Sequence, residues 1–185
     1  MKFTACPLAG AYTIDSEPIR DERGFFARVW CREEFHNVGL TTLVEQSSVS
    51  FNQKRGTLRG LHYQAAPKEE VKLVRCTRGA MYDVILDLRP RSPTFRRWFA
   101  TELNDENGRM IYVPAGFAHG FQTLSDGTEV LYQISERYHP NLAKGVRWDD
   151  PFFAIAWPNL NPILSERDRN FPDYVVSVAG ITADR

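Results

Sequence analysis

Three side chains suited to acid–base chemistry on an anionic substrate lie close together in the sequence, namely Arg59, His62 and Lys72. A histidine can take up a proton near neutral pH, an arginine can hold a phosphate through two hydrogen bonds, and a lysine can stabilise a developing oxyanion. The competing interpretation is a hydrogen-bonded core histidine beside a surface charge. For residues 59–64 alone that interpretation is favoured, so the rest of the chain must decide.

A second histidine, a tyrosine and two carboxylates extend this set. His119 lies between glycines, which suit the close approach of a backbone or a ligand, although alone it reads as structural. Asp83 shares one face of a predicted strand with apolar residues, so it lies at a solvated edge or in a polar cavity. Asp83 or Asp168 is a candidate to orient an imidazole, because a carboxylate fixes its tautomer and raises its basicity. Tyr132 is a plausible proton donor if its hydroxyl faces the same cavity.

The elements that must position these groups read as strands. Short β-branched and aromatic runs are separated by glycine, proline and Asx turns, at the spacing typical of hairpins in an all-β sandwich or barrel. A closed or two-sheet β architecture is therefore predicted. The predicted strands in this part of the chain cover residues 71–75, 80–88, 98–103, 110–113, 117–124 and 129–137.

The flanking segments are less regular. Residues 1–20 predict one or two strands, residues 25–30 an aromatic strand, and residues 31–37 a short helix that ends before Gly39. A strand with weak alternation of polar and apolar residues is predicted over residues 43–51. The polar residues at its alternate positions are Gln46, Ser48 and Ser50.

A last short helix is predicted after Ser165. Ser165 is a good N-cap, and Asp168 falls in the capping-box position. Asp168 therefore also has a purely structural interpretation.

The composition excludes several classes of protein. The 185 residues carry 23 Lys plus Arg and 23 Asp plus Glu with no block of like charge, so nucleic acid is not an expected partner. The three cysteines lack C-x-x-C pairing, which argues against a disulfide framework or a zinc knuckle and fits a reducing compartment. No stretch reaches membrane-spanning length. We expect a cytoplasmic protein with one domain over residues 1–185, because neither a repeat nor a linker divides the chain.

Taken together, these stretches resemble the dTDP-4-dehydrorhamnose 3,5-epimerase family, whose fold is a cupin-type double-stranded β-helix, or jelly roll. The resemblance covers nearly the whole length, and R-G-L-H-Y-Q and G-F-A-H-G-F, with a lysine between them, are its most specific parts. The matching residues are 21–26, 56–64, 72–75, 82–89 with 92–94, 113–121, 148–151 and 165–168.

The resemblance implies a catalytic set. His62 would remove a proton next to the C4 ketone of the sugar, with Asp168 as its carboxylate partner. Tyr132 would be the acid on the opposite face, and Lys72 would stabilise the enolate. Two further polar positions of the family's site match Asp83 and His119. No redox cofactor is implied, because a hydrogen alpha to a ketone needs only a positioned base and a cation near the oxygen.

The resemblance also implies how the substrate is held. Arg23 and Arg59 match the diphosphate contacts of the family. The residues that match positions around the nucleotide and sugar are Phe26, Gln46, Phe121 and Tyr138. The family is typically dimeric, with the segment around Arg23 and Phe26 reaching the neighbour's site. We therefore expect a homodimer that binds a nucleotide-sugar, with dTDP as the expected nucleotide.

Some positions depart from the family pattern. The chain has Arg28 for a usual glutamate, Glu70 for a glutamine, Ala143 for a glutamate and Arg167 for a lysine. The reversed charge at Arg28 is expected to affect which base, sugar or stereocentre is accepted. No H-x-H with a downstream glutamate is present, so the ligand set of metal-dependent cupins is lacking and no metal is expected.

Double epimerisation at C3 and C5 is the leading hypothesis. Epimerisation at one centre, another nucleotide-sugar, or a ketoisomerase that moves the carbonyl between C4 and C3 stays open, since the predicted base distinguishes none of them. A non-catalytic sugar-nucleotide binding module is disfavoured, because binding alone does not need the full catalytic set. A metal-dependent cupin oxygenase lacks its ligands.

Overall fold

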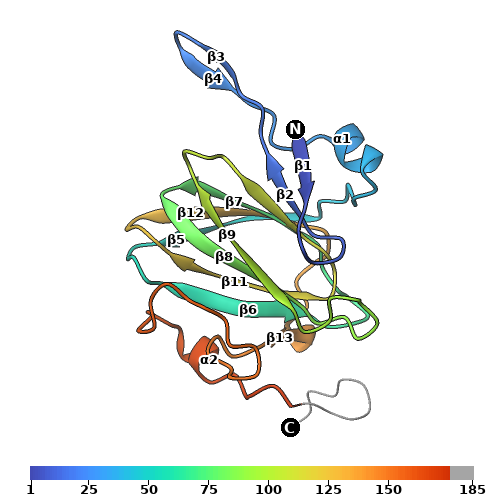
Figure 1. The fold of residues 1–185 in the computed structure, drawn as a ribbon, viewed down its shortest axis with the longest axis vertical. Helices are drawn as coiled ribbons and strands as arrows, with labels where there is room; N and C mark the ends of the chain where they lie inside the picture. The colour runs from blue at the N-terminus through green and yellow to red at the C-terminus, as the bar shows by residue number, and fades with distance from the viewer. Residues whose placement is uncertain (176–185) are drawn as a thin grey trace.

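The computed structural model describes residues 1–175 and confirms the all-β jelly roll, in which two antiparallel sheets face each other (Figure 1). The larger sheet contains, in spatial order, β1 (Lys2–Ala5), β2 (Tyr12–Asp15), β10 (Met110–Val113), β7 (Lys72–Arg78), β12 (Thr128–Ile134) and β5 (Gln46–Asn52). The smaller sheet contains β13 (Ala143–Gly145), β6 (Leu58–Gln64), β11 (Phe117–Thr123), β8 (Ala80–Asp87) and β9 (Trp98–Asn104).

A hairpin and three short helical elements complete the described chain. The hairpin pairs β3 (Ile19–Asp21) with β4 (Gly24–Phe26) and projects away from the two sheets in Figure 1. The helical elements are α1 (Arg32–Asn37), the 3-10 turn η1 (Pro140–Leu142) and α2 (Glu166–Arg169), which lies against β6. Within residues 1–175, no helix has the length and apolar character needed to span a membrane.

Most of the predicted hairpins between successive strands are wrong. β8 pairs with β9, but β7 and β8, β9 and β10, β10 and β11, and β11 and β12 lie in different sheets. The chain therefore crosses between the sheets at each of these four turns. The reason is that both sheets bury one face in a shared interior. Turn residues then mark where the chain reverses, but not which strand becomes its hydrogen-bonded neighbour.

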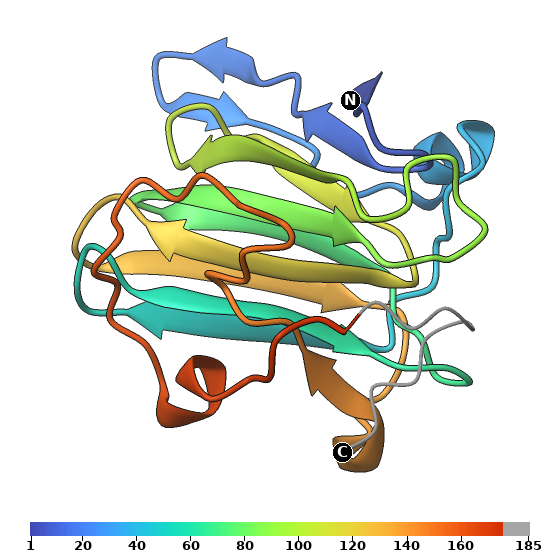
Figure 2. The same ribbon diagram turned by 60° about the horizontal axis from the view of Figure 1, so that its bottom comes forward.

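Apolar side chains fill the space between the sheets and also cover the outer face of the five-stranded sheet. The interior cluster includes Met81, Ile85 and Val130. The coil of residues 146–164 packs on the outer face, and Figure 2 shows it crossing this sheet in orange and red. β8 is thus buried on both faces, and Asp83, on the parity of Met81 and Ile85, lies between the sheets rather than at a solvated edge.

Two predicted strands near the N-terminus differ from the structure. β4 ends at Phe26, and Trp30 instead packs on Phe35 of α1, with ring centroids 6.5 Å apart. β5 begins at Gln46, so residues 43–45 of the predicted strand lie outside it. Leu43 remains largely exposed, and the Glu45 amide, which donates to the Ile134 carbonyl oxygen at 2.8 Å, marks where the pairing with β12 begins.

The close approach of β6 and β11 sets the spacing of the two predicted site histidines. These strands are neighbours, and their register places His62 opposite His119. A Cβ added at Gly60 would lie 2.5 Å from the Gly120 Cα, a distance that side chains do not tolerate. Gly60 also has φ near +133°, which L-residues rarely adopt. Glycine at position 60 therefore serves both backbone conformation and strand spacing.

We expect Gly60→Ala to lower the free energy of unfolding by more than Gly24→Ala. Gly24 has a similar φ of +124° but nothing within 4 Å of an added Cβ, so it shares the conformational cost without the collision. The difference between the variants should be about 1–3 kcal/mol, the usual cost of overpacking. Urea denaturation measures both variants. Equal losses would show that the two strands separate without penalty.

Candidate active site

His62 of β6 and Asp168 of α2 form an imidazole–carboxylate pair. The His62 Nε2 lies 2.7 Å from the Asp168 Oδ1, and the Gly60 amide donates to the other carboxylate oxygen at 3.3 Å. Burial opposes ionisation of Asp168, but the hydrogen bonds and the charge of His62 outweigh it and hold the pKa of this carboxyl below its usual value. Asp168 therefore stays ionised behind an imidazole that is partly open to solvent.

The structural interpretation of Asp168 is only half correct. The Ser165 Oγ accepts a hydrogen bond from the Asp168 amide at 3.1 Å, so Ser165 is the predicted N-cap of α2. The Asp168 carboxylate does not complete a capping box, because it faces His62 and Gly60. The short helix thus holds the acid by its backbone and leaves its side chain for the histidine.

His119 and Asp83 form a second pair, buried between the sheets. The His119 Nε2 lies 2.7 Å from the Asp83 Oδ2, and both side chains are almost fully removed from solvent. The Asp83 Oδ1 is buried without a hydrogen-bond partner among residues 1–175. Both predicted acids therefore contact a histidine. Asp83 reaches His119 from within the sheet, and Asp168 reaches His62 from α2.

Tyr132 brings a phenol to these histidines from the opposite sheet. Its ring lies edge-on to His119, with centroids 6.0 Å apart. Burial, reinforced by the negative charge of Asp83 and opposed by Arg59, raises the pKa of Tyr132 well above its usual value. The hydroxyl therefore remains protonated at neutral pH and is available as a donor.

Lys72 bridges the two sheets from the start of β7. Its Nζ lies 3.4 Å from the His62 carbonyl oxygen on β6 and 2.9 Å from the Glu70 Oε1. The ammonium is nearly buried, so the structure places a cation beside the backbone of His62.

A polar strand face lines the same interior. The register of β12 with β5 pairs Tyr132 with Ser48, and alternate residues of β5 share that face. At its far end the Asn52 Oδ1 accepts from the Arg59 Nε at 2.8 Å. Sequence reasoning selected Gln46 but missed Ser48, Ser50 and Asn52 as site-lining residues. The signal was present, because the polar parity of this strand was evident from the sequence.

The remaining predicted ligand-binding residues are dispersed. Arg23 and Phe26 lie on the projecting hairpin, where Arg23 pairs with Asp21 and Phe26 is 73% exposed. Tyr138 is also exposed. Phe121 is only 1% exposed and belongs to the interior apolar cluster. Its assignment to substrate binding stays a prediction.

The departures from the family pattern lie in three places. Arg28 forms an ion pair with Glu34 of α1 at 2.9 Å, which ties it to this chain's own N-terminal region rather than to His62. Arg167 donates to the Ala143 carbonyl oxygen at 3.4 Å, so two of the departures contact each other. Glu70 reaches Lys72 and is the departure that enters the site.

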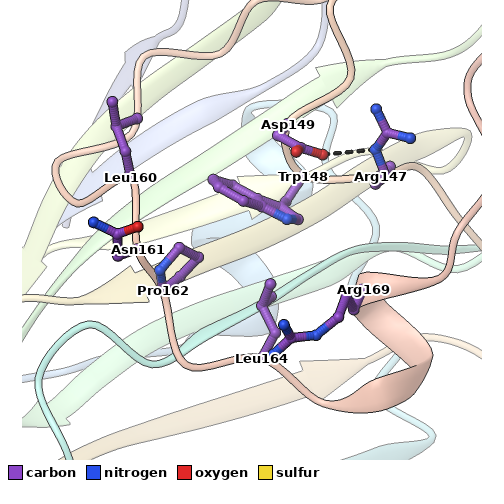
Figure 3. A pocket seen from close by; sticks show the side chains of 8 residues that line it. All are labelled: Arg147, Trp148, Asp149, Leu160, Asn161, Pro162, Leu164 and Arg169. Atoms are coloured by element: carbon purple, nitrogen blue, oxygen red, sulfur yellow. Dashed lines mark hydrogen bonds and ion pairs between the residues drawn. The ribbon is translucent and has the colours of Figure 1, made fainter.

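A separate cavity of about 610 Å³ lies on the outer side of the five-stranded sheet (Figure 3). Figure 3 shows the Trp148 ring at its centre and the Arg147–Asp149 ion pair at its rim. Its lining includes Arg169 of α2 but none of the predicted catalytic residues. Within residues 1–175, no group of three or more His, Cys, Asp or Glu side chains is placed so that it could hold a metal ion.

Comparisons with known proteins agree on one family. The model of a family described as dTDP-4-dehydrorhamnose 3,5-epimerase matches residues 5–175. An enzyme of that name from Sinorhizobium fredii is 41% identical over 93% of this chain and 89% of its own length. One from Methanothermobacter thermautotrophicus is 43% identical over 92% of both chains.

Solved structures agree with these relatives. The Bacillus anthracis dTDP-4-dehydrorhamnose 3,5-epimerase with TDP and PPi bound superposes with a TM-score of 0.91 at 40% identity, over 94% of this chain and 99% of that one. A 3'-monoepimerase from Streptomyces bikiniensis in complex with dTDP-quinovose gives a TM-score of 0.85 at 35% identity, over 91% and 85% of the two chains.

The sequence relatives and the solved structures each extend over most of this chain, and the family model spans the strands and the helix α2 that carry both imidazole–carboxylate pairs. The chain therefore belongs to the dTDP-4-dehydrorhamnose 3,5-epimerase family.

Proposed function

We propose that this chain epimerises dTDP-4-dehydro-6-deoxyglucose at C3 and C5 to dTDP-4-dehydrorhamnose, by proton transfer alone. The observation that carries the proposal is the His62–Asp168 pair, an imidazole open on one side and bonded at 2.7 Å to an ionised carboxylate on the other. This arrangement suits a general base, because the carboxylate orients the ring and stabilises the imidazolium that forms.

The chemistry needs a base and a place for negative charge. Removing the proton alpha to the C4 ketone leaves an enolate whose charge develops on the C4 oxygen. In the proposal His62 removes the proton and the Lys72 ammonium donates to that oxygen. Both groups are adjacent, since Lys72 already contacts the His62 carbonyl oxygen.

Inversion requires a proton from the other face of the carbon. Tyr132 is the proposed acid, because it belongs to the opposite sheet and its raised pKa keeps the hydroxyl protonated. In this proposal the buried His119–Asp83 pair supports the Tyr132 side of the site, where the His119 ring packs against the phenol.

The diphosphate and nucleotide are proposed to lie toward Arg59 and Gln46. Arg59 is exposed and its Nε bonds to a neutral amide, which leaves its positive charge for an anion. The exposed hairpin with Arg23 and Phe26 fits a homodimer in which it reaches the neighbour's site. Tyr138 is also exposed and is proposed to contact the same ligand. The Bacillus anthracis relative is described with TDP and PPi bound, which supports a nucleotide diphosphate ligand.

Epimerisation at C3 alone is the second candidate. It is favoured by the similarity to the Streptomyces bikiniensis 3'-monoepimerase, whose fold and identity to this chain are close to those of the double epimerases. A ketoisomerase or a binding module would use the same site around His62, Lys72 and Tyr132.

Proton NMR of dTDP-4-keto-6-deoxyglucose in deuterium oxide distinguishes these functions. Loss of both the C3 and C5 signals supports double epimerisation. Loss of one signal identifies a mono-epimerase, and a displaced carbonyl identifies a ketoisomerase. A substrate that exchanges no deuterium overturns the proposed function.

We expect His62→Ala to lower the rate of deuterium exchange by about 10²–10⁴-fold, the usual contribution of a general base. Affinity for dTDP, measured by calorimetry, should change little because His62 acts on the sugar. His36→Ala removes an exposed histidine of α1 and should leave exchange unchanged. Retained exchange in His62→Ala would reject His62 as the base.

We expect Tyr132→Phe to preserve deuterium exchange while impairing inversion, because deprotonation by His62 precedes protonation from the other face. Exchange and product configuration are both read from the same NMR spectra. Tyr63→Phe removes a phenol that packs on the outer face and serves as the control. If Tyr132→Phe also abolishes exchange, Tyr132 has another role.

We expect Asp168→Asn to lower the free energy of unfolding by about 1–3 kcal/mol near neutral pH, the usual value of hydrogen bonds to a charged group. The pKa of Asp168 is lowered in the folded state, so this stabilisation is present above the unfolded pKa of about 4 and is lost as pH falls through the folded pKa. Urea denaturation at several pH values should therefore show the two chains converging in acid. Glu166→Gln, exposed on the same helix, should show no such trend.

A further inference from the structure

Glu70 forms an ion pair with Lys72 inside the candidate active site. The Glu70 Oε1 lies 2.9 Å from the Lys72 Nζ, and the two side chains are only 13% and 9% exposed. The residues are two apart at the entry to β7, so in an extended chain they project to the same side. The same Nζ lies 3.4 Å from the His62 carbonyl oxygen, which joins this pair to the proposed base.

The Lys72 ammonium has more N–H donors than its contacts in this site use. A lysine ammonium has three N–H donors and no acceptor. The His62 carbonyl oxygen accepts from one donor and the Glu70 carboxylate lies at ion-pair distance from the same ammonium, so at least one donor remains for an oxygen of a bound ligand. Two fixed partners set the direction of the remaining N–H. Without them, the flexible lysine side chain would not hold this N–H in one direction.

Glu70 also places a negative charge beside the nearly buried ammonium. The other carboxylates of the site are engaged elsewhere, since Asp168 pairs with His62 and Asp83 pairs with His119. Within residues 1–175, Glu70 is the carboxylate at ion-pair distance from Lys72. The role of Glu70 can therefore be tested separately from the two imidazole–carboxylate pairs.

We propose that Glu70 is a positioning residue, which accepts a hydrogen bond from Lys72 so that the remaining N–H points at the C4 oxygen of the sugar. This inference rests on the proposed function. Donors fixed in advance toward a developing oxyanion stabilise the transition state more than the bound substrate. Loss of the Glu70 acceptor therefore lowers kcat and leaves KM nearly unchanged.

Two substitutions separate geometry from charge. Glu70→Gln keeps a carbonyl oxygen at the same reach but removes the negative charge, whereas Glu70→Ala removes both. We expect Glu70→Ala to lower kcat for deuterium exchange about 10- to 100-fold with KM changed less than about twofold. Glu70→Gln should stay within about threefold of the unmodified chain. The exposed neighbour provides a matched control, and Glu69→Ala should leave both constants unchanged.

A second measurement does not depend on turnover. Proton–nitrogen NMR of the lysine ammonium groups, with the Lys72 signal assigned through Lys72→Arg, reports how slowly its N–H protons exchange with water. The signal should persist in the unmodified chain and in Glu70→Gln and disappear in Glu70→Ala. If the three chains show this pattern but the unmodified chain exchanges no deuterium, the proposed function is overturned and the Glu70–Lys72 positioning is supported.

Three results would overturn the inference. Glu70→Ala with unchanged kcat and a persistent Lys72 signal would show that Lys72 is held without Glu70. A raised KM at unchanged kcat would place Glu70 in ground-state binding. Equal losses in Glu70→Gln and Glu70→Ala would show that the charge matters and the acceptor does not. Thermal unfolding checks each variant. If Glu70→Ala does not fold, loss of both kcat and the Lys72 signal in Glu70→Gln still decides against the inference.

Discussion

The need to pair buried carboxylates organises the candidate site. Asp83 and Asp168 are almost fully removed from solvent, where an unpaired charge is costly, and each lies 2.7 Å from an imidazole nitrogen. They reach the neighbouring histidines by different routes. Asp83 lies on β8 between the sheets, whereas Asp168 arrives on α2, after the coil of residues 146–164 has crossed the outer sheet face. That coil therefore covers the sheet and also leads to the acid behind His62.

The jelly-roll topology separates the two proton-transfer groups. An inversion needs a base on one face of the reacting carbon and an acid on the other. His62 belongs to the five-stranded sheet and Tyr132 to the six-stranded sheet, so in the proposed mechanism the reacting carbon would meet one group from each sheet. A meander of hairpins would place successive strands in one sheet. The crossings between the two sheets are what would supply both faces.

Local features of the fold could be predicted from the sequence, and long-range features could not. The β-branched and aromatic runs located β10, and they located β8 and β11 with one extra residue at the end of each, because strand propensity and turn residues are local. The sheet to which each strand belongs depends on contacts far apart in the chain. Asp168 illustrates the same limit, since its capping pattern is local but its contact with His62 spans 106 residues. The burial of Phe121 in the interior cluster is likewise a long-range feature, because its motif carries no information on which way its side chain points.

The charges of the site divide into compensated and uncompensated groups. Glu70 neutralises Lys72, and the two buried aspartates are bonded to histidines, so these groups act over short distances through directed hydrogen bonds. Arg59 differs, because its contact is the neutral amide of Asn52. Its exposed positive charge suits the attraction of a diphosphate. In the proposed mechanism, binding and chemistry therefore place opposite demands on the two cations. The cation proposed to attract the substrate must keep its charge, whereas the cation proposed to lie beside the enolate must keep its direction.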